Sequence, residues 1–271
     1  MIRLQRNRKA VPAEYHGSIR LARERELIEM ARLVQPDSKG KMNYIFNSKY
    51  WKKAKPQLIK ESFGKCAYCE APTNAVAHGD VEHFRPKSVY WWLAYCYDNY
   101  LYSCQICNQK HKGNKFPVGA SPWTGPDLLQ VKEGELGVDP LAGQALLDEF
   151  QAAFASEQAE LPNPYDTDPE PFFIWKADDV LGEVDILPNP NHPSAGPVFK
   201  AIKDCYGLQR KELAALRYQV YKIFEVSKLA TYAQLPQPLA AGFALQVQRM
   251  KDASAPFAGM IRYFDTIIKP S

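Results

Sequence analysis

Four of the six cysteines form two Cys-x-x-Cys pairs. The four residues are Cys66, Cys69, Cys104 and Cys107. Each pair places two thiolates close enough to hold one metal ion, and two pairs complete the tetrahedral shell of four sulfurs that is typical of structural zinc. A redox role would need only one pair. The spacing therefore predicts a structural Zn²⁺ site, whereas Cys96 and Cys205 are expected to be small buried side chains.

Glu82 and His83 lie between the two cysteine pairs, within residues 79–87. A carboxylate suits Mg²⁺, and an imidazole accepts a proton from water near neutral pH. Adjacent side chains of a strand point to opposite faces, but at a strand end or bulge both can line one site. An isolated Glu-His pair is more often structural than catalytic. A contact of His83 with the carboxylate of Glu82 or Asp80 stays open.

Asn108 favours a catalytic interpretation of Glu82 and His83, because it directly follows the second cysteine pair. A metal ion bound by the cysteines would fix the position of the Asn108 side chain. If one ion holds all four thiolates, the second pair docks against the first, just ahead of the segment that carries Glu82 and His83. The metal clamp would then bring Glu82, His83 and Asn108 together although they are far apart in the sequence.

These motifs resemble the HNH endonucleases of the ββα-metal class. The matching residues are Glu82 and His83, then Asn99, then Cys104-Gln105-Ile106-Cys107-Asn108 with the lysines that follow. The segments KCAYCE, VEHFRPKS and DNYLYSCQICNQKHKGNKFPV look more specifically like the PtuB-type HNH nucleases of the Septu anti-phage system, which also accompany some retrons. The resemblance covers about residues 50–230 and is most specific in the nuclease core.

The resemblance implies a role for each matching residue. His83 would be the general base, and Asn99 would orient the imidazole of His83 or brace the loop. Glu82 and Asn108 would hold one catalytic Mg²⁺ or Mn²⁺ on the scissile phosphate. The implied function is a metal-dependent endonuclease that acts in prokaryotic anti-phage defence and is controlled by a PtuA-type ATPase.

Two features depart from the family pattern. His111 stands where an aromatic or polar residue is expected, so it is either an additional ligand or a surface residue. The chain also extends further at its C-terminus than the family suggests, which leaves the role of residues 231–271 open.

The charge of the chain is unevenly distributed. Residues 1–117 carry 21 Lys and Arg against 10 Asp and Glu, whereas residues 118–170 carry one against 11. A basic region suits a polyanion, and we expect nucleic acid, with DNA favoured over RNA. The residues expected to contact phosphates are Arg85, Lys87, Lys110, Lys112 and Lys115. The aromatic residues between Trp91 and Tyr102 are expected to pack in the core rather than stack on bases.

The remaining patterns predict an α+β fold in which a small ββα-metal unit is embedded in a mainly helical chain. We expect a basic arm and helices in residues 1–60, the nuclease core in 61–120 and a mostly helical, partner-binding region in 121–271. Residues 171–187 are expected to form two strands, and residues 122–140 a loop. The expected helices span residues 17–34, 43–62 with a break near Pro56, 141–159, 198–229 with a break near Gly207, 238–250 and 256–267.

No segment has the roughly 20 apolar residues of a membrane helix, and the first residues lack the apolar stretch of a secretory signal. These observations predict a cytoplasmic location without a membrane partner. Two alternatives to the nuclease remain: a zinc-ribbon module that binds nucleic acid without cutting it, and a scaffold subunit of an ATPase complex. The presence of Glu82, His83 and Asn108 distinguishes the nuclease from a binding module, because a binding module would not need all three.

Overall fold

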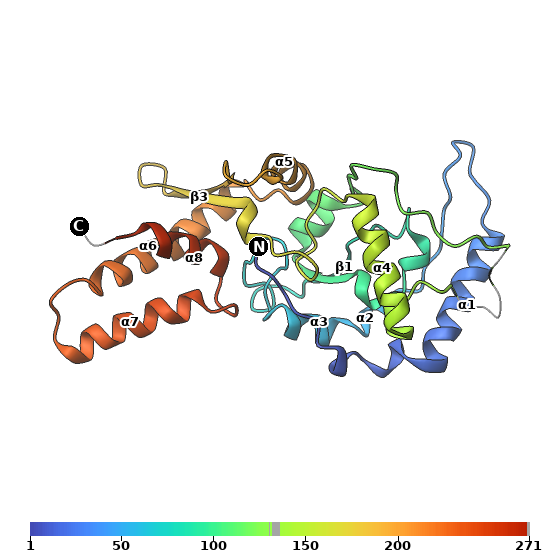
Figure 1. The fold of residues 1–271 in the computed structure, drawn as a ribbon, viewed down its shortest axis with the longest axis horizontal. Coiled ribbons are helices and arrows are strands. Elements are labelled where there is room, and N and C mark those ends of the chain that lie inside the picture. Colours follow the sequence, from blue (N-terminus) through green and yellow to red (C-terminus); the bar gives the residue numbers. More distant parts are fainter. Residues whose placement is uncertain (130, 132–135, 270–271) are drawn as a thin grey trace.

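The computed structural model describes residues 1–129, 131 and 136–269. The other residues, in the predicted loop of 122–140 and at the end of the predicted C-terminal region, lie outside the described part. The molecule is elongated (Figure 1), with helix α1 at one end and helices α6, α7 and α8 at the other. These helices are α1 Gly17–Leu33, α6 Lys211–Ala230, α7 Gln237–Lys251 and α8 Ala258–Ile267.

The predicted α+β class is confirmed. The other α-helices are α2 Lys49–Lys52, α3 Lys55–Glu61, α4 Gln144–Glu157 and α5 Ala195–Tyr206. Two antiparallel sheets of two strands each are formed by β1 Asp80–His83 with β2 Tyr100–Ser103 and by β3 Phe173–Asp178 with β4 Glu183–Pro188. The short helical elements are η1 Arg8–Ala10, η2 Ala13–Tyr15, η3 Trp91–Leu93, η4 Tyr97–Asn99, η5 Ile106–Lys112, η6 Pro140–Ala142 and η7 Glu170–Phe172. The two strands predicted within residues 171–187 are therefore present.

The predicted helix over residues 43–62 is the one that differs most. Helical structure begins only at Lys49, and the interruption lies at Lys53 and Ala54, ahead of the predicted break at Pro56. Pro56 occupies the first turn of α3, where the missing N–H of proline would have no helical partner in any case. The proline therefore starts a helix instead of breaking one.

The predicted break at Gly207 separates α5 from α6. Gly207 has a φ of 59°, in the left-handed region that glycine adopts without strain. It is also in close contact with η5, because a Cβ atom at this position would lie 2.4 Å from the ring of His111. The glycine thus serves both the turn between the helices and their packing against the residues that follow the second cysteine pair.

One cluster of buried residues links all three predicted regions of the chain. It contains Met1 and Ile2, the cysteine Cys66, and Phe264 of α8. The apolar side chains of the N-terminal segment therefore enter the core. Arg6 fixes it further, with one nitrogen 3.1 Å from Glu61 of α3 and another donating to the carbonyl of Tyr100 in β2.

The aromatic residues in the segment that leads into β2, and those in β2 itself, are buried, as predicted. They are Trp91, Trp92, Tyr95, Tyr97, Tyr100 and Tyr102. Tyr97, Tyr100 and Tyr102 pack with Leu58 of α3, and the others pack with α1. These rings are therefore core residues and are not available to stack on bases. Among the described residues, no helix is both long enough and apolar enough to cross a membrane.

A buried ion pair joins the loop after β1 to the end of α4. Arg85 is 1% exposed, and its Nε and Nη2 lie 2.8 Å and 2.6 Å from Oε2 of Glu157. The other carboxylate oxygen accepts hydrogen bonds from the Tyr90 hydroxyl and, at 3.1 Å, from the backbone N–H of Trp123. Both charges are thus compensated inside an aromatic environment.

We expect Glu157→Gln to lower the free energy of unfolding by about 3–5 kcal/mol, because it leaves the guanidinium of Arg85 buried without its counter-charge. Urea unfolding at pH 7 would measure the loss. Glu149→Gln is the matched control, since Glu149 is exposed on the same helix and its substitution should cost less than about 0.5 kcal/mol. Equal losses in the two variants would contradict this account of the pair.

Candidate functional site

The four predicted zinc ligands come together in the structure. Their sulfur atoms all lie within 4.8 Å of one another, and the Sγ atoms of Cys69 and Cys104 are 3.9 Å apart. Four sulfurs at a tetrahedral zinc ion with bonds of about 2.3 Å would be separated by about 3.8 Å. The predicted convergence is confirmed, and the donor set fits structural zinc.

Local structure explains how the two pairs face each other. The first pair lies in a turn after α3, where the N–H of Cys66 donates to the carbonyl of Ala71 at 3.0 Å and Glu70 has a φ of 60°. The second pair lies at the end of β2 and the start of η5. The N–H of Ala67 also donates to the carbonyl of Tyr102 in strand β2 at 2.9 Å. This bond holds the first pair against the strand that leads into the second.

One residue beside the sulfurs was not predicted from the sequence. Arg210, just ahead of α6, donates from Nη1 to the Sγ of Cys107 at 3.6 Å and to the carbonyl of Gly207 at 3.0 Å. Its positive charge offsets the negative charge that four thiolates would carry. His111 is absent from the cysteine cluster and packs on Gly207 instead. Its ring is therefore a packing contact in the described structure.

Glu82, His83 and Asn108 line one cavity of about 280 Å³. His83 is the last residue of β1 and pairs with Tyr100 of β2, and Glu82 pairs with Leu101. The strand ends at this point, so two successive side chains reach the same cavity although they leave the strand on opposite faces. Asn108 comes from η5. Lys87 and Gln109 complete this side of the wall.

His83 is held as a neutral imidazole. The side chain is 6% exposed, and its ring lies edge-on to the rings of Trp51 and Tyr100, with centroids 5.1 Å and 5.0 Å away. Nε2 is 3.0 Å from the carbonyl of Ala94, which can only accept, so Nε2 carries the proton and Nδ1 keeps its lone pair. Burial, helped by the charge of Lys87, lowers the pKa of His83 to about 3.

Asn99 braces the loop that follows β1. Its amide oxygen accepts the N–H of Arg85 at 2.8 Å, and its amide nitrogen donates to the carbonyls of Arg85 at 2.9 Å and Leu93 at 3.3 Å. Of the two roles expected for Asn99, these contacts match loop bracing. The brace also holds the backbone next to Ala94, whose carbonyl binds His83.

Glu82 and Asn108 each have a charged neighbour. Glu82 is 3% exposed, and its Oε1 lies 2.5 Å from the ammonium of Lys112 and 3.4 Å from the hydroxyl of Tyr68. Burial raises the pKa of Glu82, and the charge of Lys112 opposes that rise. Asn108 donates from its amide nitrogen to Asp80 at 3.0 Å, which leaves its amide oxygen as a ligand. Asp80 therefore positions Asn108, and the hydrogen bond of His83 goes to Ala94 instead.

The five residues predicted to contact phosphates fall into two groups. Arg85 and Lys112 are each 1% exposed and ion-paired, with Glu157 and Glu82 respectively. In this structure neither cation presents an open surface to a phosphate, because both are buried and paired, so their contact with phosphate stays a prediction. Lys110 and Lys115 are exposed, and Lys87 is partly exposed beside the cavity with its ammonium 5.2 Å from the centre of the Trp51 ring.

A larger basic groove lies between the N-terminal segment and α3. It has a volume of about 890 Å³, and the cations along it include Arg3, Arg8, Lys9 and Lys60. Its acidic residue, Glu61, is already paired with Arg6. Part of the positive charge of residues 1–117 therefore lies along a concave surface.

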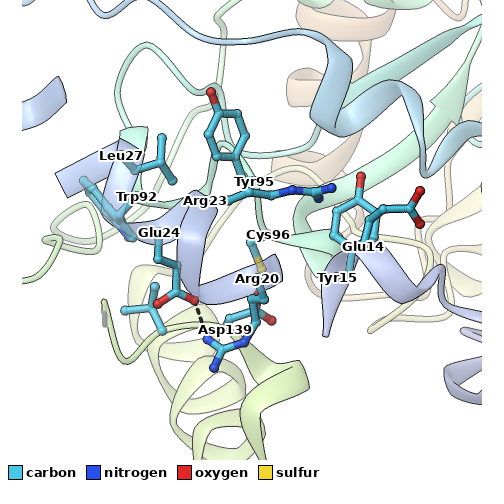
Figure 2. A pocket seen from close by; sticks show the side chains of 11 residues that line it. Glu14, Tyr15, Arg20, Arg23, Glu24, Leu27, Trp92, Tyr95, Cys96 and Asp139 are labelled. Carbon is cyan, nitrogen blue, oxygen red and sulfur yellow. Dashed lines mark hydrogen bonds and ion pairs between the residues drawn. The ribbon is translucent and has the colours of Figure 1, made fainter. Parts of the chain in front are cut away.

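Cys96, Asp98 and Asp139 form a second group of close ligand-type atoms. Asp98 is paired with Arg8 at 2.6 Å, and Asp139 accepts the N–H of Leu141 at 2.9 Å. Burial raises the pKa of Asp139 to about 7. Figure 2 shows Cys96 and Asp139 beside a cavity of about 10 Å³, which is room for about one water molecule. These contacts account for the group without a metal ion.

We expect the purified protein to contain one zinc ion per chain and Cys69→Ala to lose it. Binding by four thiolates stabilises small zinc units by about 10–16 kcal/mol, so the variant should also unfold at lower urea concentration. Elemental analysis by mass spectrometry gives the zinc content. Cys205→Ala is the control, because Cys205 is buried outside the four-cysteine cluster. Full zinc content in Cys69→Ala would contradict the site.

We expect His83 to make stability depend on pH. Its pKa is lowered from 6.5 to about 3 on folding, so between these pH values the unfolded chain binds a proton that the native chain does not. The stabilisation is complete above pH 6.5 and is lost as the pH falls towards 3. Between pH 7 and pH 5 the loss amounts to about 2 kcal/mol. Urea unfolding of His83→Gln should show a pH-dependent loss smaller by that amount, and equal losses would contradict the assignment.

The chain is similar in sequence to a known protein. No family model matches the chain, and no solved structure matches it significantly. The chain is 31% identical over 186 residues to the Septu protein PtuB of Bacillus mycoides (strain KBAB4). The match covers 64% of this chain and 52% of the relative, so the chain spans about half the length of the curated protein it matches. The predicted resemblance is thereby confirmed: over the matched residues, this chain is a homologue of a Septu PtuB protein.

Proposed function

We propose that the chain is a metal-dependent HNH endonuclease that hydrolyses phosphodiester bonds of nucleic acid, with DNA favoured over RNA. The observation that carries the proposal is the single cavity lined by Glu82, His83 and Asn108. A zinc-binding module that only held nucleic acid would have no need of a base and two oxygen ligands around one cavity. The order of β1, β2 and η5 beside the four cysteines is in keeping with a ββα-metal unit.

His83 supplies the base in this proposal. A phosphodiester resists hydrolysis because water is a poor nucleophile and because negative charge builds up on the phosphate. The neutral imidazole accepts a proton from the attacking water at Nδ1, since Nε2 is bound to Ala94. General base catalysis of this kind accelerates a reaction by roughly 10²–10⁴-fold. The low pKa keeps the base unprotonated throughout the neutral range.

Glu82 and Asn108 would hold Mg²⁺ or Mn²⁺, because carboxylate and amide oxygens are the ligands that these ions prefer. When bound, the ion would neutralise charge on the phosphate. Asp80 holds the Asn108 amide so that its oxygen is available. Lys87, Lys110 and Lys115 stay proposed phosphate contacts.

The basic groove supports a polyanionic substrate. Its cations Arg3, Arg8, Lys9 and Lys60 lie along a concavity on α3, and α3 packs on both β1 and β2. Cations that neutralise phosphates supply most of the non-specific affinity for nucleic acid. The substrate would therefore be held partly by residues outside the cavity in which it is cut.

The similarity to a Septu PtuB protein supports a biological role. We propose that the nuclease is an effector of anti-phage defence and that a PtuA-type ATPase restrains or activates it, because an unrestrained nuclease would damage the cell. The second candidate function is a non-catalytic subunit that binds nucleic acid or serves as a scaffold for the ATPase.

We expect the protein to cleave plasmid DNA in the presence of Mg²⁺ or Mn²⁺, alone or with a PtuA-type ATPase, and His83→Ala to reduce the rate by at least about 10²-fold. The assay compares plasmid DNA with total RNA, each with and without metal. Lys203→Ala, an exposed substitution on α5, serves as the matched control and should cleave normally.

The outcomes separate the two candidate functions. Loss of metal-dependent cleavage in His83→Ala, with nucleic-acid binding retained, supports the nuclease and identifies the polymer. If neither protein cuts under any condition while both still bind nucleic acid, the non-catalytic function replaces it. Unchanged cleavage in His83→Ala would rule out His83 as the base.

A further inference from the structure

Lys112 places a positive charge on a carboxylate that the proposed function assigns to a metal ion. Its side chain is 1% exposed, its Nζ lies 2.5 Å from Oε1 of Glu82, and the same nitrogen donates to the carbonyl of His83 at 3.1 Å. Glu82 is thus already paired inside the protein. The arrangement differs from that of Lys110, which is exposed two residues earlier.

Helix η5 carries both Asn108 and Lys112 towards the end of β1. Residues Ile106–Lys112 form a π-helix, in which each N–H bonds the carbonyl five residues earlier. The N–H of Gly113 donates to the carbonyl of Asn108 at 2.7 Å in this pattern. One turn of a π-helix holds more than four residues, so Asn108 and Lys112 project on the same side. Gly113, with a φ of 51°, then ends the helix.

A divalent ion and the ammonium of Lys112 are in direct competition for Glu82. An ion bound to either carboxylate oxygen would lie a few ångströms from Nζ, and like charges at that range in a buried site repel strongly. The ammonium cannot be shielded by water, because the contact is buried. Without Lys112, Glu82 would be a buried carboxylate without a counter-charge, so a bound cation would supply the compensation that Lys112 now gives.

We propose that Lys112 is an internal counter-cation that keeps the catalytic metal site closed until its ammonium withdraws from Glu82. The inference rests on the proposed function, in which Glu82 and Asn108 are the metal ligands. It assigns to Lys112 the control of metal affinity in the absence of substrate. An anion that approaches the cavity, such as a substrate phosphate, offers Lys112 an alternative partner and would favour loading of the metal.

The test is Mn²⁺ binding to the full chain with its zinc retained and without nucleic acid, followed by electron paramagnetic resonance of free Mn²⁺. Lys112→Met removes the charge and keeps the length of the side chain, and it should bind Mn²⁺ about ten-fold or more tightly than the native protein. Lys112→Arg keeps the charge and should remain near the native affinity. Lys110→Met makes the same charge change at an exposed position and should change the affinity by less than about three-fold.

A second measurement needs no substitution and covers the case in which Lys112→Met does not fold. Native protein is treated with a lysine-acetylating reagent, and modification of Lys112 is quantified by peptide mass spectrometry. Lys112 should be protected without Mn²⁺ and should become reactive when Mn²⁺ is bound, whereas Lys110 should react equally in both states. Protection of Lys112 that persists in the Mn²⁺-bound protein would overturn the proposal.

The controls distinguish failure of this inference from failure of the proposed function. If Mn²⁺ binds equally to the native protein and Lys112→Met, and Glu82→Gln abolishes binding, the metal site stands and the role of Lys112 is refuted. If Mn²⁺ binds to none of the variants, the proposed metal site falls and the inference falls with it. Tighter binding by Lys112→Met that Glu82→Gln abolishes supports both.

Discussion

The convergence of four cysteine sulfurs is the constraint on which the rest of the site depends. It joins the turn after α3 to the end of β2, and so it fixes where η5 begins. The position of η5 in turn decides which side chains face the end of β1. Because the sulfurs would repel one another if ionised, a bound zinc ion would make this convergence favourable. The chemistry of the cavity therefore depends on an interaction outside it.

Buried charge is compensated locally throughout this region. Glu82 is matched by Lys112, and Arg85 by Glu157, each at a distance at which removal of one partner leaves an isolated charge. His83 differs, because its ring is hydrogen-bonded to a backbone carbonyl and burial favours its neutral form. The cavity therefore contains an unprotonated imidazole next to a carboxylate that is already paired.

The three regions predicted from the sequence share one hydrophobic core. Met1 and Ile2 pack with residues of α8, and Arg210 ties the start of α6 to Cys107. His111 packs on the glycine that joins α5 to α6. The C-terminal helices are thus attached to the cysteine cluster through several independent contacts. A change in those helices has a direct structural route to η5 and hence to Asn108 and Lys112.

The sequence by itself determined the α+β class, the four-cysteine cluster, the aromatic core and the break at Gly207, because spacing, periodicity and glycine conformation are local properties. The same local patterns placed Glu82, His83 and Asn108 close to one another through the cysteines. Only the tertiary structure decided that Arg85 and Lys112 are buried partners of Glu157 and Glu82, since a charged residue looks alike in the sequence whether it faces solvent or a distant carboxylate. These ion pairs join residues far apart in the sequence, and the spacing of motifs does not predict such pairs.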